Sequence, residues 1–122
     1  MILHESGEDY LEAILVLREK NQDVHSIDIA NLLGYSKPSV SIAMKKLREN
    51  GYITMEDNNH IMLTESGEAA AIRVYTRHKT ITELFQMMGV SAETAAEDAC
   101  KVEHDLSEET FQCMQKYLES KK

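Results

Sequence analysis

A chain of 122 residues, 43% of them hydrophobic, is long enough for one small domain or for one domain with a helical appendage. One Pro, five Gly and no Trp favour helices joined by short connections. No apolar run reaches the roughly 18 residues of a membrane span and no signal-peptide pattern is present, so we expect a cytoplasmic protein without a membrane partner. Two cysteines, Cys100 and Cys113, are too few for a disulfide framework.

Charge is distributed unevenly along the chain. The net charge of −8 opposes binding to nucleic acid, because contacts with phosphate need cations. Residues 26–50, however, carry four bases and two acids, a net charge of +2, whereas residues 1–25 carry two bases and six acids, a net charge of −4. The negative charge of such a protein would repel DNA until part of that charge is neutralised, which a bound divalent cation could do.

The apolar spacing predicts an amphipathic helix over residues 7–20, with Tyr10, Ile14 and Leu15 on its apolar face. A second helix follows, with Ser26 expected as its N-cap and Gly34 as its end. Its expected buried face consists of Ile29, Ala30, Leu32 and Leu33.

Another helix is predicted immediately after a short break, capped by Ser36 and ended by Gly51. Pro38 falls in its first turn, where the missing N–H costs little. Its expected core-facing residues are Val40, Met44 and Leu47. Two short helices joined by a tight turn that contains Gly predict a helix-turn-helix.

The segments YITME and IMLT alternate apolar and polar residues on either side of the turn-rich DNNH, which predicts a β-hairpin. A hairpin directly after a helix-turn-helix is a wing. Three helices should complete the chain: Thr64 or Ser66 to about Met88, Ser91 to about Asp105, and Ser107 to about Glu119. We therefore expect a mainly α fold, with a winged helix-turn-helix domain at residues 1–72 and a C-terminal helical region at 73–122.

Small, polar and cationic side chains mark the second helix of the helix-turn-helix as a recognition helix. Short side chains can approach base edges, while lysines lie near phosphates. The DNA-binding candidates are Ser36, Lys37, Pro38, Ser39, Ser41, Lys45 and Lys46. None of them is an Arg, Asn or Gln that could contact a base in a bidentate way, so we expect modest base readout and a sizeable contribution from DNA shape.

Possible metal ligands lie outside the helix-turn-helix. Cys100, Glu103 and His104 are spaced i, i+3 and i+4, which places them on one face if this segment is helical. Asp9 and Glu12 share a face of the first predicted helix, and His78 lies on the long helix. Each alone is more typical of a solvated or packed side chain. Together they would form a mixed oxygen, nitrogen and sulfur site for one or two ions, although their spacing does not show that the helices meet.

The chain resembles the diphtheria-toxin-repressor family of iron- and manganese-dependent regulators, especially its manganese-transport-regulator branch. The resemblance covers nearly the whole chain, in order. The matching segments are EDYLEAILVL at 8–17, SIDIANLLGYSKPSVSIAMKKLRENGYI at 26–53, IMLTESG at 61–67, RHKTITELFQMMGV at 77–90 and EDACKVEHDLS at 97–107.

This resemblance implies a homodimer held by its C-terminal helical region, in which metal binding fits the two DNA-binding domains to a palindromic operator. By position it makes metal ligands of Asp9, Glu12, His78, Cys100, Glu103 and His104. It is expected to be the short form of the family, without the C-terminal SH3-like domain of longer members.

At two positions the sequence departs from one of the two branches, so the identity of the metal stays open between Mn(II) and Fe(II). The manganese branch has a carboxylate at the position of Cys100, and the iron branch has a Met at the position of Asp9. The iron branch also has a carboxylate where this chain has Thr82, which argues against that branch's ancillary metal site.

The leading hypothesis is a non-enzymatic repressor, of metal-uptake genes, that needs metal to bind DNA. A winged-helix regulator that senses a small molecule without metal is one alternative. A metal-dependent hydrolase is a weaker one, because no residue stands out as a nucleophile and no Gly-rich phosphate loop is present.

Overall fold

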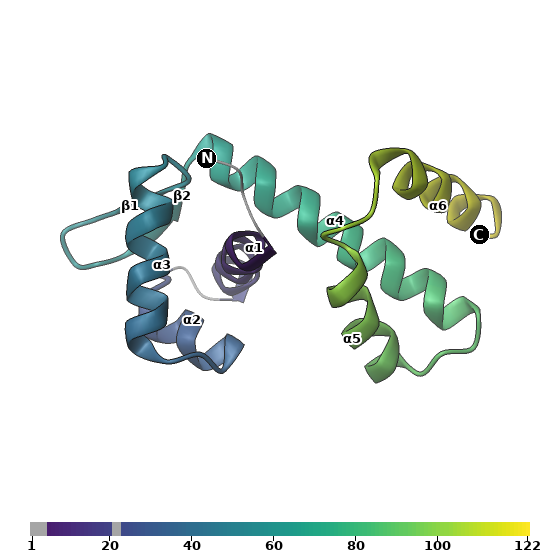
Figure 1. Ribbon diagram of the computed structural model, residues 1–122, viewed down its shortest axis with the longest axis horizontal. Coiled ribbons are helices and arrows are strands. Elements are labelled where there is room, and N and C mark those ends of the chain that lie inside the picture. Colours follow the sequence, from purple (N-terminus) through teal and green to yellow (C-terminus); the bar gives the residue numbers. More distant parts are fainter. Residues whose placement is uncertain (1–4, 21–22) are drawn as a thin grey trace. The chain divides into compact units, whose positions relative to one another are not determined.

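The structure, a computed structural model, describes residues 5–20 and 23–122. Over these residues the chain forms six helices and one two-stranded sheet (Figure 1). In chain order they are α1 (Glu5–Lys20), α2 (Ser26–Leu33), α3 (Lys37–Glu49), β1 (Ile53–Met55), β2 (Ile61–Leu63), α4 (Glu65–Met87), α5 (Ala92–Val102) and α6 (Glu108–Ser120). The predicted mainly α fold with a helix-turn-helix and a hairpin wing is confirmed.

The chain divides into two compact units, Met1–Ile72 and Arg73–Lys122, and the boundary between them falls within α4. Among the helices of the described residues, none combines the length and apolar character needed to cross a membrane.

The core of the first unit joins α1, the helix-turn-helix and the hairpin. Its fully buried side chains are Leu11, Ile14, Val24, Ile29, Val40, Met44, Leu47, Ile53 and Ile61. On α3, the buried residues Val40, Met44 and Leu47 follow the spacing i, i+4 and i+7, which leaves the other side of the helix outside the core. The prediction of these three core residues is confirmed.

The start of α2 differs from the prediction. His25, rather than Ser26, is the N-cap, because the Asp28 carboxylate accepts a hydrogen bond from the His25 backbone N–H at 2.9 Å. The helix therefore begins one residue earlier than a Ser26 cap would require. Leu32 and Leu33 were predicted to be buried, but Leu32 is 44% exposed and Leu33 is partly exposed, since Ile29 and Ala30 fill the inner face of this short helix. Gly34 ends the helix in the left-handed conformation, as predicted.

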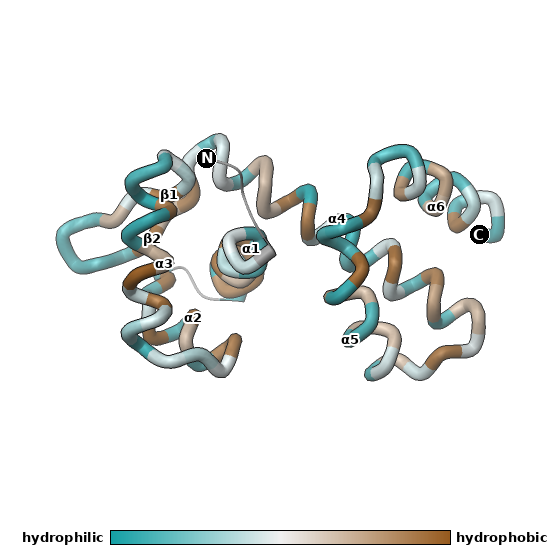
Figure 2. The backbone as a smooth tube through the Cα atoms, viewed as in Figure 1, coloured by the Kyte–Doolittle hydropathy of each residue, from teal (hydrophilic) through white to brown (hydrophobic). Residues whose placement is uncertain are grey.

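The hairpin pairs β1 with β2 in antiparallel register, with Ile53 opposite Leu63 and Met55 opposite Ile61. A hydrogen bond of 2.8 Å from the Ile61 backbone N–H to the Val24 carbonyl ties β2 to the segment that precedes α2. The connection between the strands, residues 56–60, is hydrophilic and extends away from the helices of this unit (Figure 2). The base of the wing is thus fixed to the helix-turn-helix, while its tip is exposed.

A close contact fixes the start of α4 against the end of the helix-turn-helix. The Thr64 hydroxyl donates a hydrogen bond of 2.6 Å to the Gly51 carbonyl and accepts one of 3.1 Å from the Gly67 backbone N–H. Any Cβ at Gly67 would collide with the Tyr52 carbonyl oxygen. Only glycine allows this approach of the α4 backbone to Tyr52.

The second unit packs the end of α4 with α5 and α6. Its buried apolar side chains are Val74, Ile81, Ala95, Ala99, Phe111 and Leu118. The predicted caps are confirmed, because the hydroxyls of Ser91 and Ser107 accept hydrogen bonds from the backbone N–H groups of Thr94 and Thr110.

The end of α5 corrects the sequence prediction. We expected this helix to continue to about Asp105, but it ends at Val102 with Glu103 as its C-cap. Arg77 offers a physical reason, because its guanidinium donates to the carbonyls of Glu103 at 3.1 Å and Leu106 at 2.6 Å. These carbonyls therefore bond to a side chain instead of continuing a helix.

Candidate metal centre and nucleic-acid interface

The second unit holds a cluster of three possible metal ligands from two parts of the chain. His78 lies on α4, Cys100 on the last turn of α5, and Glu103 at the α5 C-cap. One ligand atom from each lies within 4.8 Å of the other two. The three side chains offer a nitrogen, a sulfur and an oxygen donor, a set that suits a borderline transition metal.

Glu103 is the buried member of this cluster, with a relative exposure of 1%. Its Oε2 lies 2.9 Å from His78 Nδ1, whereas its Oε1 makes no hydrogen bond within the described residues. A buried carboxylate oxygen without a hydrogen bond costs free energy, and a cation bound beside it would remove that cost. The residues present therefore fit a metal ion.

His104 lies directly after Glu103, in the turn that follows α5. Its Nε2 is 3.5 Å from Glu103 Oε1, and only 2% of its side chain is exposed. The imidazole of His104 therefore lies near the same carboxylate as His78. It does so from the turn after α5 and not, as the spacing of Cys100, Glu103 and His104 predicted, from a face of that helix. Its distance from Glu103 keeps it a candidate ligand.

Asp9 and Glu12, the remaining predicted ligands, lie one turn apart on α1 in the first unit. Both are partly exposed. Their participation in a metal centre with residues of the second unit stays a prediction.

Arg77 holds the backbone around the cluster in place, and the sequence analysis did not identify this role. Its side chain is 5% exposed and pairs with the Glu108 carboxylate at 2.9 Å, in addition to the two carbonyls named above. Its guanidinium carbon lies 5.1 Å from the centre of the Phe111 ring. The hydrogen bond from Arg77 is the main reason that the pKa of Glu108 lies below its ordinary value. A signal existed in the sequence, because Arg77 occupies the buried stripe between Val74 and Ile81.

The exposed side of α3 carries the predicted DNA-binding residues. All seven are exposed: Ser36, Lys37, Pro38, Ser39, Ser41, Lys45 and Lys46. Ser36 is the helix N-cap, and its hydroxyl also bonds to the Ser39 hydroxyl at 2.9 Å. This face is free of core contacts and carries three lysines, as a surface that meets phosphates requires.

Beside α3 lies a pocket of about 220 Å³, which the sequence analysis did not predict. It is lined by Ser26, Ser41, Met44, Lys45, Arg48 and Met55. Arg48 approaches Met55 on β1 with 3.9 Å between its Nη1 and the Met55 sulfur. The cations of this pocket add to the positive charge on the same side of the helix-turn-helix.

Family models match both parts of the chain. Residues 2–61 match the model described as "Iron dependent repressor, N-terminal DNA binding domain", and residues 64–122 match "Iron dependent repressor, metal binding and dimerisation domain". Together the two matches span almost the entire sequence. The chain belongs to the iron-dependent repressor family, a family of metal-dependent transcriptional regulators, as the resemblance in the sequence implied.

Individual members of this repressor family agree with the match. The chain is 37% identical over 119 residues to an HTH-type transcriptional regulator of Methanocaldococcus jannaschii, covering 96% of this chain and 95% of that protein. It is 36% identical over 104 residues to the transcriptional regulator MntR of Escherichia coli, covering 85% of this chain and 67% of that protein. Among solved structures, the manganese regulator SloR is 28% identical with a TM-score of 0.81, covering 98% of this chain but only 55% of SloR. The chain thus spans about half the length of SloR.

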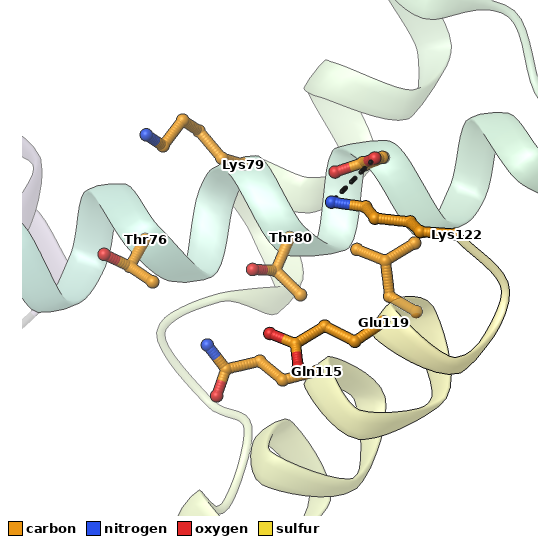
Figure 3. Close-up of a pocket in the computed structure, with 8 residues that line it drawn as sticks. Thr76, Lys79, Thr80, Gln115, Glu119 and Lys122 are labelled. Carbon is orange, nitrogen blue, oxygen red and sulfur yellow. Dashed lines mark ion pairs between the residues drawn. The ribbon is translucent and has the colours of Figure 1, made fainter.

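A second pocket in the part matched by the family's metal-binding and dimerisation model, about 290 Å³ in volume, lies between α4 and α6 (Figure 3). Figure 3 shows Thr80 of α4 on one side of it and Gln115 and Glu119 of α6 on the other. Lys122 Nζ pairs with Glu83 Oε1 at 3.4 Å on its wall. Its lining combines two lysines with two glutamates and contains no His or Cys, so it does not resemble a transition-metal site.

Proposed function

We propose that this chain is a repressor that binds operator DNA when Mn(II) or Fe(II) is bound in its second unit. The observation that carries the proposal is the cluster of His78, Cys100 and Glu103, whose ligand atoms lie within 4.8 Å of one another. The cluster lies in the part of the chain that matches a metal-binding and dimerisation model. The exposed basic face of α3, in the part that matches a DNA-binding model, supports the other half of the proposal.

The full ligand set that we propose adds His104, Asp9 and Glu12 to the cluster, for one or two ions in each subunit. Carboxylates from α1 would give an ion more hard oxygen donors, which Mn(II) and Fe(II) accept alongside imidazole. The thiolate of Cys100 favours Fe(II) over Mn(II), whereas the carboxylates suit both. The names of relatives support manganese, because SloR is described as a manganese regulator.

The protein must have one conformation that fits DNA and another that fits it less well. Metal can activate DNA binding only if it binds the first conformation more tightly than the second. A bound ion would supply positive charge to a protein with a net charge of −8 and would join residues of α4 and α5 to one centre. The added positive charge favours the approach of α3 to phosphates. The residues of α3 that we propose for DNA contact are Ser36, Lys37, Pro38, Ser39, Ser41, Lys45 and Lys46.

We propose that the regulator acts as a homodimer in the cytoplasm. The match to a dimerisation domain supports two copies, and a two-fold dimer reads a palindromic operator. A repressor that needs bound metal silences its genes when that metal is abundant. Genes for metal uptake are therefore its proposed targets.

The test is a DNA-binding titration with metal-free protein. Duplexes selected from a random pool in the presence of Mn(II) would be labelled, and binding would be followed by fluorescence anisotropy with Mn(II), anaerobic Fe(II), Zn(II), Mg(II) or a chelator. We expect Mn(II) or Fe(II) to raise the affinity by at least about tenfold, within the usual range of coupling between sites. Mg(II), which prefers all-oxygen sites with several waters, should have little effect. DNA affinity that is indifferent to metal and to chelator would overturn the proposal in favour of a metal-independent regulator.

A further inference from the structure

A large apolar side chain lies among the polar and cationic residues on the exposed face of α3. Ile42 is 59% exposed, although the helix buries Val40 and Met44 two residues before and after it. At about 100° per residue, a position two residues from both lies on the side of the helix opposite the core. Ile42 is therefore at the centre of the outward face and takes no part in the core.

The neighbours of Ile42 on this face are the residues expected to contact DNA. Pro38 and Ser39 lie one turn before it, and Lys45 and Lys46 lie one turn after it, all exposed. A recognition helix enters the major groove with the centre of its outward face toward the base edges and its flanking cations toward phosphates. Ile42 occupies that central position.

Two of the polar side chains before Ile42 are already engaged with each other. The Ser36 hydroxyl accepts from the Ser39 backbone N–H at 3.3 Å and bonds to the Ser39 hydroxyl at 2.9 Å. The Ser36 hydroxyl caps the helix and is bonded to the Ser39 hydroxyl, which reduces the capacity of both to read bases. The side chain at position 42, at the centre of the face, is therefore a principal candidate for sequence readout.

An isoleucine side chain forms no hydrogen bonds and can recognise only an apolar group. In the major groove that group is the C5-methyl of thymine, which no other standard DNA base carries. We propose that Ile42 contacts a thymine methyl group in each operator half-site and so determines the preference for thymine at that position. This inference rests on the proposed DNA-binding function and adds a specificity-determining residue to it.

The test removes the methyl group from the DNA and the isoleucine from the protein, separately and together. Duplexes selected by the metal-loaded wild-type protein would be resynthesised with deoxyuridine in place of each thymine in turn. For wild type we expect one thymine in each half-site whose replacement weakens binding by about fourfold, the effect of burying one methyl group. For Ile42→Ala we expect the same replacement to change binding by less than about twofold.

Ile27→Ala is the matched control, because Ile27 is an isoleucine of α2 that is 41% exposed but does not lie on α3. It should retain the full effect of deoxyuridine. Both positions are exposed, so neither substitution should impair folding. An equal deoxyuridine effect in wild type and Ile42→Ala, or none in wild type at any thymine, would overturn the inference while leaving metal-dependent binding intact. Failure to select any duplex would instead overturn the proposed function, and this inference with it.

Discussion

The face of α3 in the first unit and the ligand cluster of the second unit are built in opposite ways. The candidate residues of α3 lie on one continuous helix, are exposed, and make few contacts beyond the cap at Ser36. The cluster brings His78 of α4 to Cys100 and Glu103 at the end of α5, and its central carboxylate is buried. A surface that meets a large partner can be presented by one element. A site that surrounds a small ion needs several elements fixed against one another.

The comparison predicts that the cluster tolerates substitution less well than the face does. Within the cluster, Glu103 contacts His78, lies 3.5 Å from the neighbouring His104 and contributes the oxygen without a hydrogen bond. Within the face, no residue has so many partners.

Glu103→Gln should nearly abolish metal binding while preserving the volume of the side chain. A neutral amide replaces the charged ligand. Substituting a residue that only hydrogen-bonds to a metal ligand typically lowers metal affinity by about 10- to 100-fold, so for the ligand itself we expect a loss of Mn(II) affinity of at least about 100-fold, measured by calorimetry. Metal-activated DNA binding should disappear with it. Glu97→Gln, which alters an exposed acid on α5, is the control and should leave both unchanged. Unaltered Mn(II) affinity in Glu103→Gln would mean that the cluster is not the metal centre.

Arg77→Met should destabilise the second unit by about 2 kcal/mol, within the usual cost of leaving buried carbonyl groups without a hydrogen bond. The change leaves the carbonyls of Glu103 and Leu106 without their donor. Urea denaturation measures this loss, and Mn(II) affinity should fall as well because the turn that carries Glu103 loses its anchor.

Lys101→Met provides the matched comparison for Arg77→Met, since Lys101 is an exposed cation on α5. It should change the free energy of unfolding by no more than about 0.5 kcal/mol. Equal effects of the two substitutions would show that Arg77 acts only through its charge and does not anchor the turn.

The same contrast explains which features could be predicted from the sequence. The caps at Ser36, Ser91 and Ser107 and the hairpin depend on neighbouring residues, so local patterns were enough to predict them. The predicted burial of Leu32 was wrong because tertiary packing overrides the local pattern. The predicted end of α5 was wrong because Arg77 bonds to the carbonyl of Glu103. The meeting of His78 with Glu103, 25 residues away, depends on tertiary packing, so only the family resemblance indicated it.

The helix caps offer a direct test of independence between the two units. Ser36→Ala and Ser107→Ala each remove a side chain that accepts a backbone N–H at a helix start, and each should cost about 1 kcal/mol of stability. Only Ser36→Ala should weaken DNA binding at saturating metal, because its helix carries the proposed contacts. Anisotropy with a selected duplex measures this, and an equal loss of DNA affinity in both variants would contradict the assignment of α3 as the recognition helix.

The smallest expected effect concerns pH and the exposed carboxylate of Glu108. Its pKa is lowered from 4.5 in the folded protein, chiefly by the hydrogen bond from Arg77. A carboxyl whose pKa is lower in the folded state stabilises that state above its ordinary pKa, and this contribution is lost as the pH falls through the lowered value.

Wild type should therefore be more stable than Glu108→Gln at pH 7, and the difference should shrink as the pH falls below 4.5. Urea denaturation at stepwise lower pH measures that difference. Glu109→Gln removes the neighbouring acid, which is not among the hydrogen-bond acceptors of Arg77 named above, and serves as the control for the loss of one carboxylate at this helix start. A stability difference between wild type and Glu108→Gln that stays constant down to about pH 3 would contradict the role of this ion pair, since the lowered pKa requires the contribution to vanish in acid.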